Sequence, residues 1–176
     1  DIGVATATDG SNVELQPVAS YRGPFSAGRH EITWTATDSQ GNQSKAVQVV
    51  KVLPLVNLSP SSLIAEGGEI IIRAVLSGDA ADYPVKIPYI LSGTASYEED
   101  YQIVQSNRQV TIDQGREASF SIEVKVDDKP ENNETIEITL DSATNAVLGS
   151  VTQRTITIVD GNLPPQITVQ VEQGDN

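Results

Sequence analysis

The stretch QVTIDQGREASFSIEVKVDDKPENNETIEITL, residues 109–140, decides the fold of this chain. It contains three short runs rich in β-branched residues, at 109–112, 118–126 and 135–140, and polar turns separate these runs. Apolar and polar residues alternate within each run, which is typical of strands that bury one face. The stretch therefore predicts antiparallel strands and not helices.

The same pattern continues through the rest of the chain, where helical periodicity is almost absent. Turn residues such as Asp9-Gly10, Gly41-Asn42 and Asp160-Gly161 interrupt it. Further runs lie at residues 13–18, 30–37, 46–52, 70–76, 85–91 and 155–159. Many short strands at this spacing predict an all-β chain made of tandem antiparallel immunoglobulin-like β-sandwiches.

Charge and composition exclude several classes of protein. Asp and Glu total 24 against 11 Lys and Arg, and the net charge of −13 repels nucleic acid and anionic membranes. No apolar run is long enough to span a bilayer. The chain has no cysteine, which excludes disulfides, Cys-ligated zinc and a thiol nucleophile. A secreted β protein without disulfides needs a large core or another staple, such as a divalent metal.

The motifs of catalysis are also missing from the sequence. His30 is the single histidine, and no serine elbow accompanies it. Aromatic residues make up 5% of the chain, too few to line a sugar-binding cleft beside paired carboxylates. No glycine-rich phosphate loop lies between a strand and a helix. We therefore expect no enzymatic activity from this chain.

Two interruptions divide the chain. Two prolines break the apolar stretch at residues 53–60, and Leu163-Pro164-Pro165 follows the strand that ends before Asp160. We expect a first, partial module at 1–54, a second module at 55–161, and a linker with the opening strand of a third module at 162–176. The sequence starts and stops in mid-pattern, so we expect a piece of a longer chain whose first module lacks its leading strand.

The acids of the second module are distributed unevenly. If successive strands run antiparallel, alternate loops and the end of the last strand share one pole of the sandwich. Nine acids are then expected at that pole, which we call the acidic pole: Glu66, Glu98, Glu99, Asp100, Asp127, Asp128, Glu131, Glu134 and Asp160. Only Lys129 dilutes them, and about five acids are expected at the opposite pole: Asp79, Asp82, Asp113, Glu117 and Asp141.

Such a gathering of carboxylates favours a bound cation. Two carboxylates about 5 Å apart repel by roughly 3 kcal/mol at an effective dielectric near 20. A hard cation with six to eight oxygen ligands relieves this repulsion. Loosely spaced loop carboxylates suit Ca²⁺ better than Mg²⁺, and transition metals prefer the imidazole and thiolate groups that this chain lacks. Loop acids are also common as plain solvated charges, and Glu98 and Glu99 fit that reading best.

Residues 24–52, PFSAGRHEITWTATDSQGNQSKAVQVVKV, resemble hyalin-repeat and related immunoglobulin-like modules of bacterial and animal surface proteins. A G-x-H-x-I-x-W-x-A-x-D pattern, the turn at 38–42 and the strand after it carry the resemblance. The pattern itself predicts that Ile32, Trp34 and Ala36 point inward and that an Asp/Gly/Asn turn reverses the chain. We expect Trp34 to be a core residue and Asp38 a turn residue.

Four motifs of the second module, in order, resemble Calx-beta repeats. The motifs are Glu66-Gly67, YEEDY at 97–101, VDDKPENNE at 126–134 and ITIVD at 156–160. This family includes the regulatory calcium-binding domains of sodium–calcium exchangers and many repeats of bacterial surface proteins. By position, the resemblance implies these metal ligands: Glu66, Asp100, Asp127, Asp128, Glu131 and Asp160.

Two departures from the family pattern weaken the expected site. Asp160 is followed by Gly161 and Asn162, where the strongest calcium binders of the family carry a run of Asp, and the loop after residue 126 is one residue shorter. We therefore expect about one Ca²⁺ ion, with a dissociation constant on the order of 10⁻⁵ to 10⁻³ M.

These patterns together predict a calcium-binding structural or adhesion module of a repetitive extracellular or cell-surface protein, bacterial by its resemblances. Its expected partners are calcium ions, neighbouring modules of the same chain and a cell-surface or matrix ligand. Two alternatives stay open: a carbohydrate- or protein-binding module, and an accessory domain of a secreted enzyme.

Overall fold

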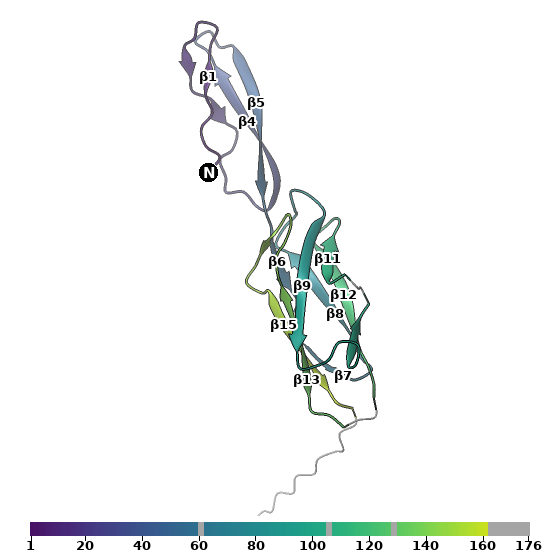
Figure 1. Cartoon of the computed structure of the whole chain (residues 1–176). Coiled ribbons are helices and arrows are strands. Elements are labelled where there is room, and N and C mark those ends of the chain that lie inside the picture. The colour runs from purple at the N-terminus through teal and green to yellow at the C-terminus, as the bar shows by residue number, and fades with distance from the viewer. Residues whose placement is uncertain (60–61, 105–106, 128–129, 162–176) are drawn as a thin grey trace, which may run out of the picture.

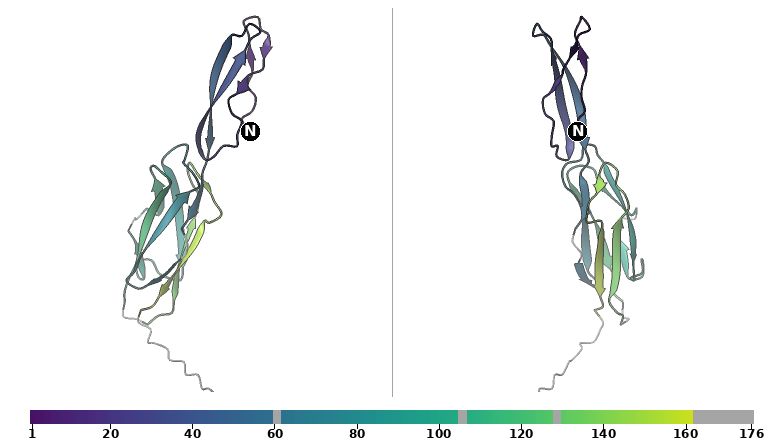
Figure 2. Two further views of the ribbon diagram at one scale, coloured as in Figure 1. Left: turned by 180° about the vertical axis from the view of Figure 1, so that it is seen from behind. Right: turned by 90° about the vertical axis from the view of Figure 1, so that its left-hand side faces the viewer.

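The computed structural model describes residues 1–59, 62–104, 107–127 and 130–161. Within these ranges every regular element is a strand, and no helix is long and apolar enough to cross a membrane. Figures 1 and 2 show two elongated modules joined end to end, with the first module above the second in Figure 1. The predicted all-β sandwich class is confirmed.

The second module is a sandwich of two five-stranded sheets. One sheet has the order β10 (Tyr101–Ile103), β12 (Glu117–Val124), β8 (Glu69–Leu76), β6 (Leu55–Leu58) and β14 (Val147–Leu148). The other has the order β11 (Gln109–Ile112), β9 (Val85–Gly93), β13 (Glu134–Leu140), β15 (Gln153–Val159) and β7 (Ser62–Ala65). Neighbouring strands are antiparallel except for two edge strands, β7 beside β15 and β14 beside β6.

The core of this module lies between the two sheets. Alternate residues of β13, namely Ile136, Ile138 and Leu140, are buried, as the alternation in the sequence predicts. The rings of Tyr89 on β9 and Phe120 on β12 stack with their centroids 4.5 Å apart, and this contact joins the two sheets. A large continuous core explains how the module folds without disulfides.

The Tyr89 hydroxyl in the core leads to a testable prediction. The Tyr89 hydroxyl is buried without a hydrogen-bond partner among the described residues, and burial raises the pKa of this phenol to about 12. An unpaired buried hydroxyl costs about 1–3 kcal/mol. Tyr89→Phe keeps the ring stack and should therefore raise the free energy of unfolding by about 1 kcal/mol. Chemical denaturation measures this change, and a clear loss of stability would show that the hydroxyl is paired in solution.

Two stretches differ from the strands expected from sequence. Residues 53–60 were expected to contain the boundary, with the second module beginning at 55, and β6 begins at that residue and buries Val56 and Leu58 in the core. The chain then crosses to the other sheet as β7, so one edge strand is split between the sheets. A second crossing separates β10 from β11. Pro54 precedes β6 directly, and Pro60 lies outside the described residues.

The first module consists of a three-stranded sheet and a much smaller two-stranded ladder. Its main sheet has the order β3 (Val18–Ala19), β4 (Gly28–Thr37), β5 (Gln43–Val52), and a two-residue ladder joins β1 (Ala7–Thr8) to β2 (Glu14–Leu15). The run expected at 13–18 is broken at Gln16-Pro17, because proline supplies no N–H for a ladder.

The hairpin of the first module follows the sequence closely. Ile32, Trp34 and Ala36 are buried, which confirms the predicted inward alternation. The Asp38 carboxylate accepts hydrogen bonds from the backbone N–H groups of Gln40 and Asn42, each at 2.8 Å. Asp38 is therefore the turn residue that the sequence predicts.

Candidate metal site

The strand pairing brings the predicted acids to one end of the second module. β7 runs parallel to β15, so Glu66 after β7 and Asp160 after β15 lie at the same end. β13 runs antiparallel to β15 with Glu134 opposite Ile158, which places the start of β13 there as well. Tyr101 pairs with Val124, and the Lys125 N–H donates to the Asp100 carbonyl at 2.8 Å. Four separate segments therefore meet at this pole.

Three carboxylates form the tightest group, which we call the three-carboxylate cluster. Asp100, Glu131 and Glu134 each place a carboxylate oxygen within 4.8 Å of the others, and all three side chains are half-buried. A cavity of about 10 Å³ lies beside them, which is roughly the space of a single water or ion. Its lining residues are Glu66, Glu99, Asp100, Val124, Lys125, Asp127, Glu131, Glu134 and Ile158.

Like charge dominates the electrostatics of this cavity. Burial, together with the charge of Asp100 and a hydrogen bond to its carboxyl, raises the pKa of Glu134 above its ordinary value. Burial and the negative charges of Asp160 and Asp127 likewise raise the pKa of Glu66. Both shifts mean that the folded protein resists full ionisation of these acids, which a cation would reverse.

Asp160 connects the last strand to the cluster. It is the most deeply buried charged residue of the described chain, with 7% of its surface exposed. Its Oδ2 accepts a hydrogen bond of 2.7 Å from the Glu131 N–H. The Gly161 N–H in turn donates to the Glu66 carboxylate. The exit of β15 is thus held by two backbone hydrogen bonds to acids of the pole.

Of the six predicted ligands, the structure gathers Glu66, Asp100, Asp127, Glu131 and Asp160 around or next to this cavity. Asp128 lies outside the described residues. The assignment of these side chains as metal ligands stays a prediction.

Sequence reasoning missed one member of the three-carboxylate cluster. It left Glu134 among the general acids of the pole, whereas the structure places its oxygen beside those of Asp100 and Glu131. A signal was available: Glu134 has the same parity as Ile136 and Ile138, so it extends the inward-facing row of β13 beyond the last apolar residue.

The pole also contains a cation that the sequence argument did not count. Lys125 lines the cavity, and its Nζ donates to the backbone carbonyl of Glu98. At the opposite pole two of the acids have direct partners, because Arg116 pairs with Asp79 and Lys51 pairs with Asp82, each at 2.7 Å. The second of these pairs crosses between the two modules.

A pH dependence follows from the raised pKa values. Between an unfolded carboxyl pKa of about 4.3 and the higher folded values of Glu66 and Glu134, the folded chain binds more protons than the unfolded chain. In calcium-free buffer the stability of the second module should therefore fall as pH rises through this window. Thermal melts from pH 4.5 to 7 test this, and Glu134→Gln should make the decline shallower. A stability that rises with pH across the window in both chains would contradict the assignment.

Comparisons with known proteins agree with this class of fold and site. No family model matches the chain, and no curated protein matches it. Solved structures do match, and three of them are Calx domains, one of which is named a calcium-binding domain. The covered share of this chain, 58 to 63%, is close to the share that residues 55–161 make up.

Three of these structures are named. CBD12 from CALX1.2 is 27% identical with a TM-score of 0.53, and the match covers 63% of this chain and 45% of that one. The apo form of the Calx CBD1 domain is 26% identical with a TM-score of 0.51, over 60% of this chain and 97% of that one. The calcium-binding domain CBD12 of CALX1.1 is 28% identical with a TM-score of 0.51, over 58% and 42%. The chain therefore spans less than half of the two CBD12 structures.

Proposed function

We propose that this chain is a calcium-binding structural module of a repetitive extracellular or cell-surface protein, bacterial by the resemblances of its sequence. The observation that carries the proposal is the three-carboxylate cluster, Asp100, Glu131 and Glu134, beside an ion-sized cavity. The likeness to solved calcium-binding domains supports it.

An all-oxygen donor set on separate loops fits Ca²⁺ among the common metal ions. Calcium accepts six to eight oxygens in flexible geometry, and carboxylates, backbone carbonyls and water all serve. The three-carboxylate cluster would supply the first ligands, and Glu66, Asp127 and Asp160 are close enough to contribute or to neutralise the ion. Asp128 is proposed as a further ligand on the sequence resemblance alone.

Calcium would add a further link between segments of the pole that backbone hydrogen bonds already join. Glu131 links the three-carboxylate cluster to the end of β15, because its carboxylate belongs to the cluster and its N–H donates to Asp160. An ion bound to Glu131 would fix the direction in which the chain leaves β15. In a repetitive protein this would limit bending at the following joint and would protect the loops against proteolysis.

Calorimetric titration of the chain with CaCl₂ tests binding, and MgCl₂ serves as the comparison ion. We expect saturable heat with calcium and weaker heat with magnesium. Hydrogen exchange tests the stiffening: calcium should slow exchange of the Glu131 and Gly161 amides, while amides of the 38–42 turn stay unchanged. No heat and an unchanged melting curve with calcium would refute the binding. Binding without added protection of Glu131 and Gly161 would refute the stiffening role alone.

A further inference from the structure

The linker between the two modules is very short. β5 ends at Val52 and β6 begins at Leu55, so only Leu53 and Pro54 lie between the two strands. Pro54 is fully buried, and its carbonyl accepts a hydrogen bond of 2.9 Å from the Val147 N–H, so it belongs to the second module. Its ring also fixes one of its two backbone torsions. Bending between the modules therefore depends mainly on Leu53.

One loop of the second module contacts the first module. This loop, residues 77–84 between β8 and β9, is here called the joint loop, and it lies at the end of the second module nearest the first (Figures 1 and 2). A Cβ added to Gly78 would lie 3.0 Å from the Ala27 Cβ, so the two backbones approach closely. A Cβ added to Gly28 would lie 3.8 Å from the Asp79 carbonyl oxygen. The modules thus touch beside the linker.

An ion pair supplies a second contact between the modules. The Lys51 Nζ on β5 lies 2.9 Å and 2.7 Å from the two carboxylate oxygens of Asp82 in the joint loop. The other acid of this loop, Asp79, pairs with Arg116 of the second module at 2.7 Å. Both acids of the joint loop therefore have a cationic partner within the chain. This joint needs no metal ion to neutralise them.

The joint loop is held in shape by its own module. The Tyr83 hydroxyl accepts a hydrogen bond of 3.1 Å from the Ala80 N–H and donates one of 2.5 Å to the Gly115 carbonyl. Ala80 is buried in the core of the second module. The Ser77 Oγ accepts a hydrogen bond of 2.9 Å from the Leu55 N–H, which ties the loop to the first residue of β6. The loop is thus a fixed surface against which the first module packs.

We propose that the joint loop holds the two modules as one rigid body without a metal ion, with Ala27 and Lys51 of the first module as its contact points. This proposal goes beyond the calcium site, because the joint loop lies at the pole opposite to the three-carboxylate cluster. The entry side of the second module would then stay stiff whether or not calcium is bound at the acidic pole.

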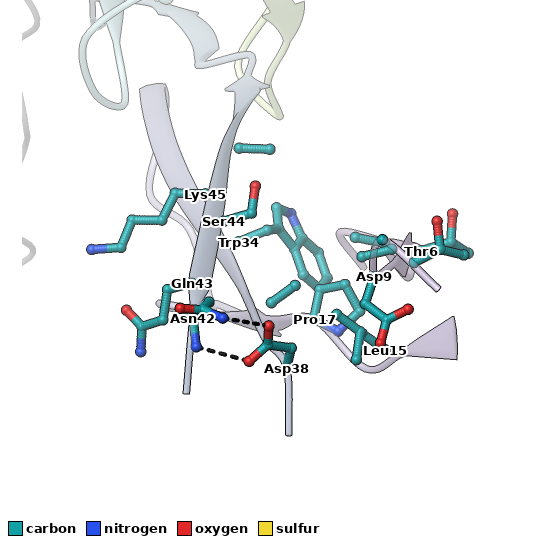
Figure 3. Close-up of a pocket in the computed structure, with 16 residues that line it drawn as sticks. Thr6, Asp9, Leu15, Pro17, Trp34, Asp38, Asn42, Gln43, Ser44 and Lys45 are labelled. Carbon is teal, nitrogen blue, oxygen red and sulfur yellow. Dashed lines mark hydrogen bonds between the residues drawn. The ribbon is translucent and has the colours of Figure 1, made fainter. Parts of the chain in front are cut away.

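Residual dipolar couplings of the full chain test this rigidity, because they report the orientation of each N–H bond in one molecular frame. The first module supplies probes up to its far end, since the turn there is held by the hydrogen bonds from Asn42 to Asp38 that Figure 3 shows. We expect the couplings of both modules to fit a single alignment tensor, in chelator and in CaCl₂ alike. Two tensors of different magnitude in chelator would overturn the proposal, whatever calorimetry shows for the calcium site.

Gly78→Val should rotate the first module against the second. The added side chain would begin 3.0 Å from the Ala27 Cβ, whereas carbon atoms in contact lie about 3.5–4.0 Å apart. Gly28 pairs with Val52, so Ala27 lies about one strand spacing, roughly 4.8 Å, from the linker. A displacement of about 1 Å at this short distance corresponds to a rotation of about 10°. The orientation of the alignment tensor in each module measures this rotation.

Gly10→Val is the matched control for this substitution. Neither Gly10 nor Gly78 has a positive φ, so valine strains the backbone at neither position. Nothing lies within 4 Å of a Cβ added to Gly10, and this variant should keep the orientation of the parent chain. Unchanged amide shifts of β13 would show that the second module is folded in both variants. An orientation that is also unchanged in Gly78→Val would contradict the proposed contact.

Charge reversal tests the ion pair. Asp82→Lys places a second ammonium group beside Lys51, so two alignment tensors should become necessary. The pair is half-exposed, and we therefore expect a smaller effect than that of Gly78→Val. Adding Lys51→Asp to this variant restores opposite charges and should return the single tensor. A double variant that stays as loose as Asp82→Lys, or no effect of Asp82→Lys, would remove Lys51 as a contact point.

Discussion

Asp100→Asn combined with Glu134→Gln should abolish the rise in melting temperature that calcium gives the second module. A ligand at about 100 times its dissociation constant stabilises a folded protein by about 2.7 kcal/mol. For a module of this size that corresponds to a shift of about 10 °C or more. The double substitution removes two of the three clustered carboxylates, keeps the shape of the side chains and leaves each with one acceptor oxygen. Thermal melts by circular dichroism, with calcium and with chelator, measure the difference.

Without calcium, the same variant should melt at a higher temperature than the parent chain. Burial and the neighbouring charge of Asp100 raise the pKa of Glu134, so ionising both groups in the folded chain is unfavourable, and neutral amides remove this cost. We therefore expect the variant to melt at a higher temperature than the parent chain in chelator and at a lower one in calcium. If these acids have a purely structural role, the variant should melt at a lower temperature than the parent chain in both buffers. A higher melting temperature in chelator together with a lower one in calcium therefore indicates calcium binding.

Asp79→Asn is the matched control at the opposite pole. It also replaces a carboxylate by an amide, but Asp79 pairs with Arg116 at 2.7 Å and follows the end of β8 that is opposite to the acidic pole. This variant should lose a little stability and keep its full response to calcium. Trp34 provides a second control, because it reports on the first module only. A calcium response that disappears equally in Asp79→Asn would place the ion elsewhere.

Much of the acidic pole was predictable because it depends on strand alternation. Alternation fixes which face of β13 and β15 is buried, and chain reversal at each turn fixes which loops share an end. These two rules place Asp100, Glu131 and Asp160 together without any knowledge of packing. Applied one residue further, they also place Glu134 in the site. The sequence argument stopped at Thr135 because it treated the charged residue as part of the loop.

Sheet switching was not predictable in the same way. Whether β6 and β7 belong to one sheet depends on which edge lacks a partner, and β14 and β15 supply those edges from about 90 residues later in the chain. Local pattern contains no information about such a partner. The prolines at 54 and 60 marked the expected boundary, with the second module beginning at 55, but the local sequence does not show that the edge strand changes sheets after β6.

Gly93→Ala should be among the most destabilising single substitutions in the second module, with a loss of about 3 kcal/mol or more. Gly93 ends β9 at a φ of +121°, a conformation that side chains disfavour. It pairs with Ile136, and a Cβ at this position would lie far inside contact distance of the Thr135 carbonyl oxygen. Backbone cannot rotate away as a flexible side chain would, so β9 and β13 must separate locally.

The local separation of β9 and β13 should also displace a carboxylate of the metal site. Thr135 adjoins Glu134, and its carbonyl accepts a hydrogen bond of 3.1 Å from the Ala95 N–H, so a shift of Thr135 moves a cluster carboxylate. We expect calcium binding to weaken by about tenfold, the equivalent of about 1.4 kcal/mol. Gly115→Ala is the control, because Gly115 has a φ of +72° but no atom within 4 Å of an added Cβ. That variant should lose only about 1 kcal/mol and bind calcium normally. Equal losses for the two alanines would show that backbone strain, and not the contact with Thr135, decides the cost.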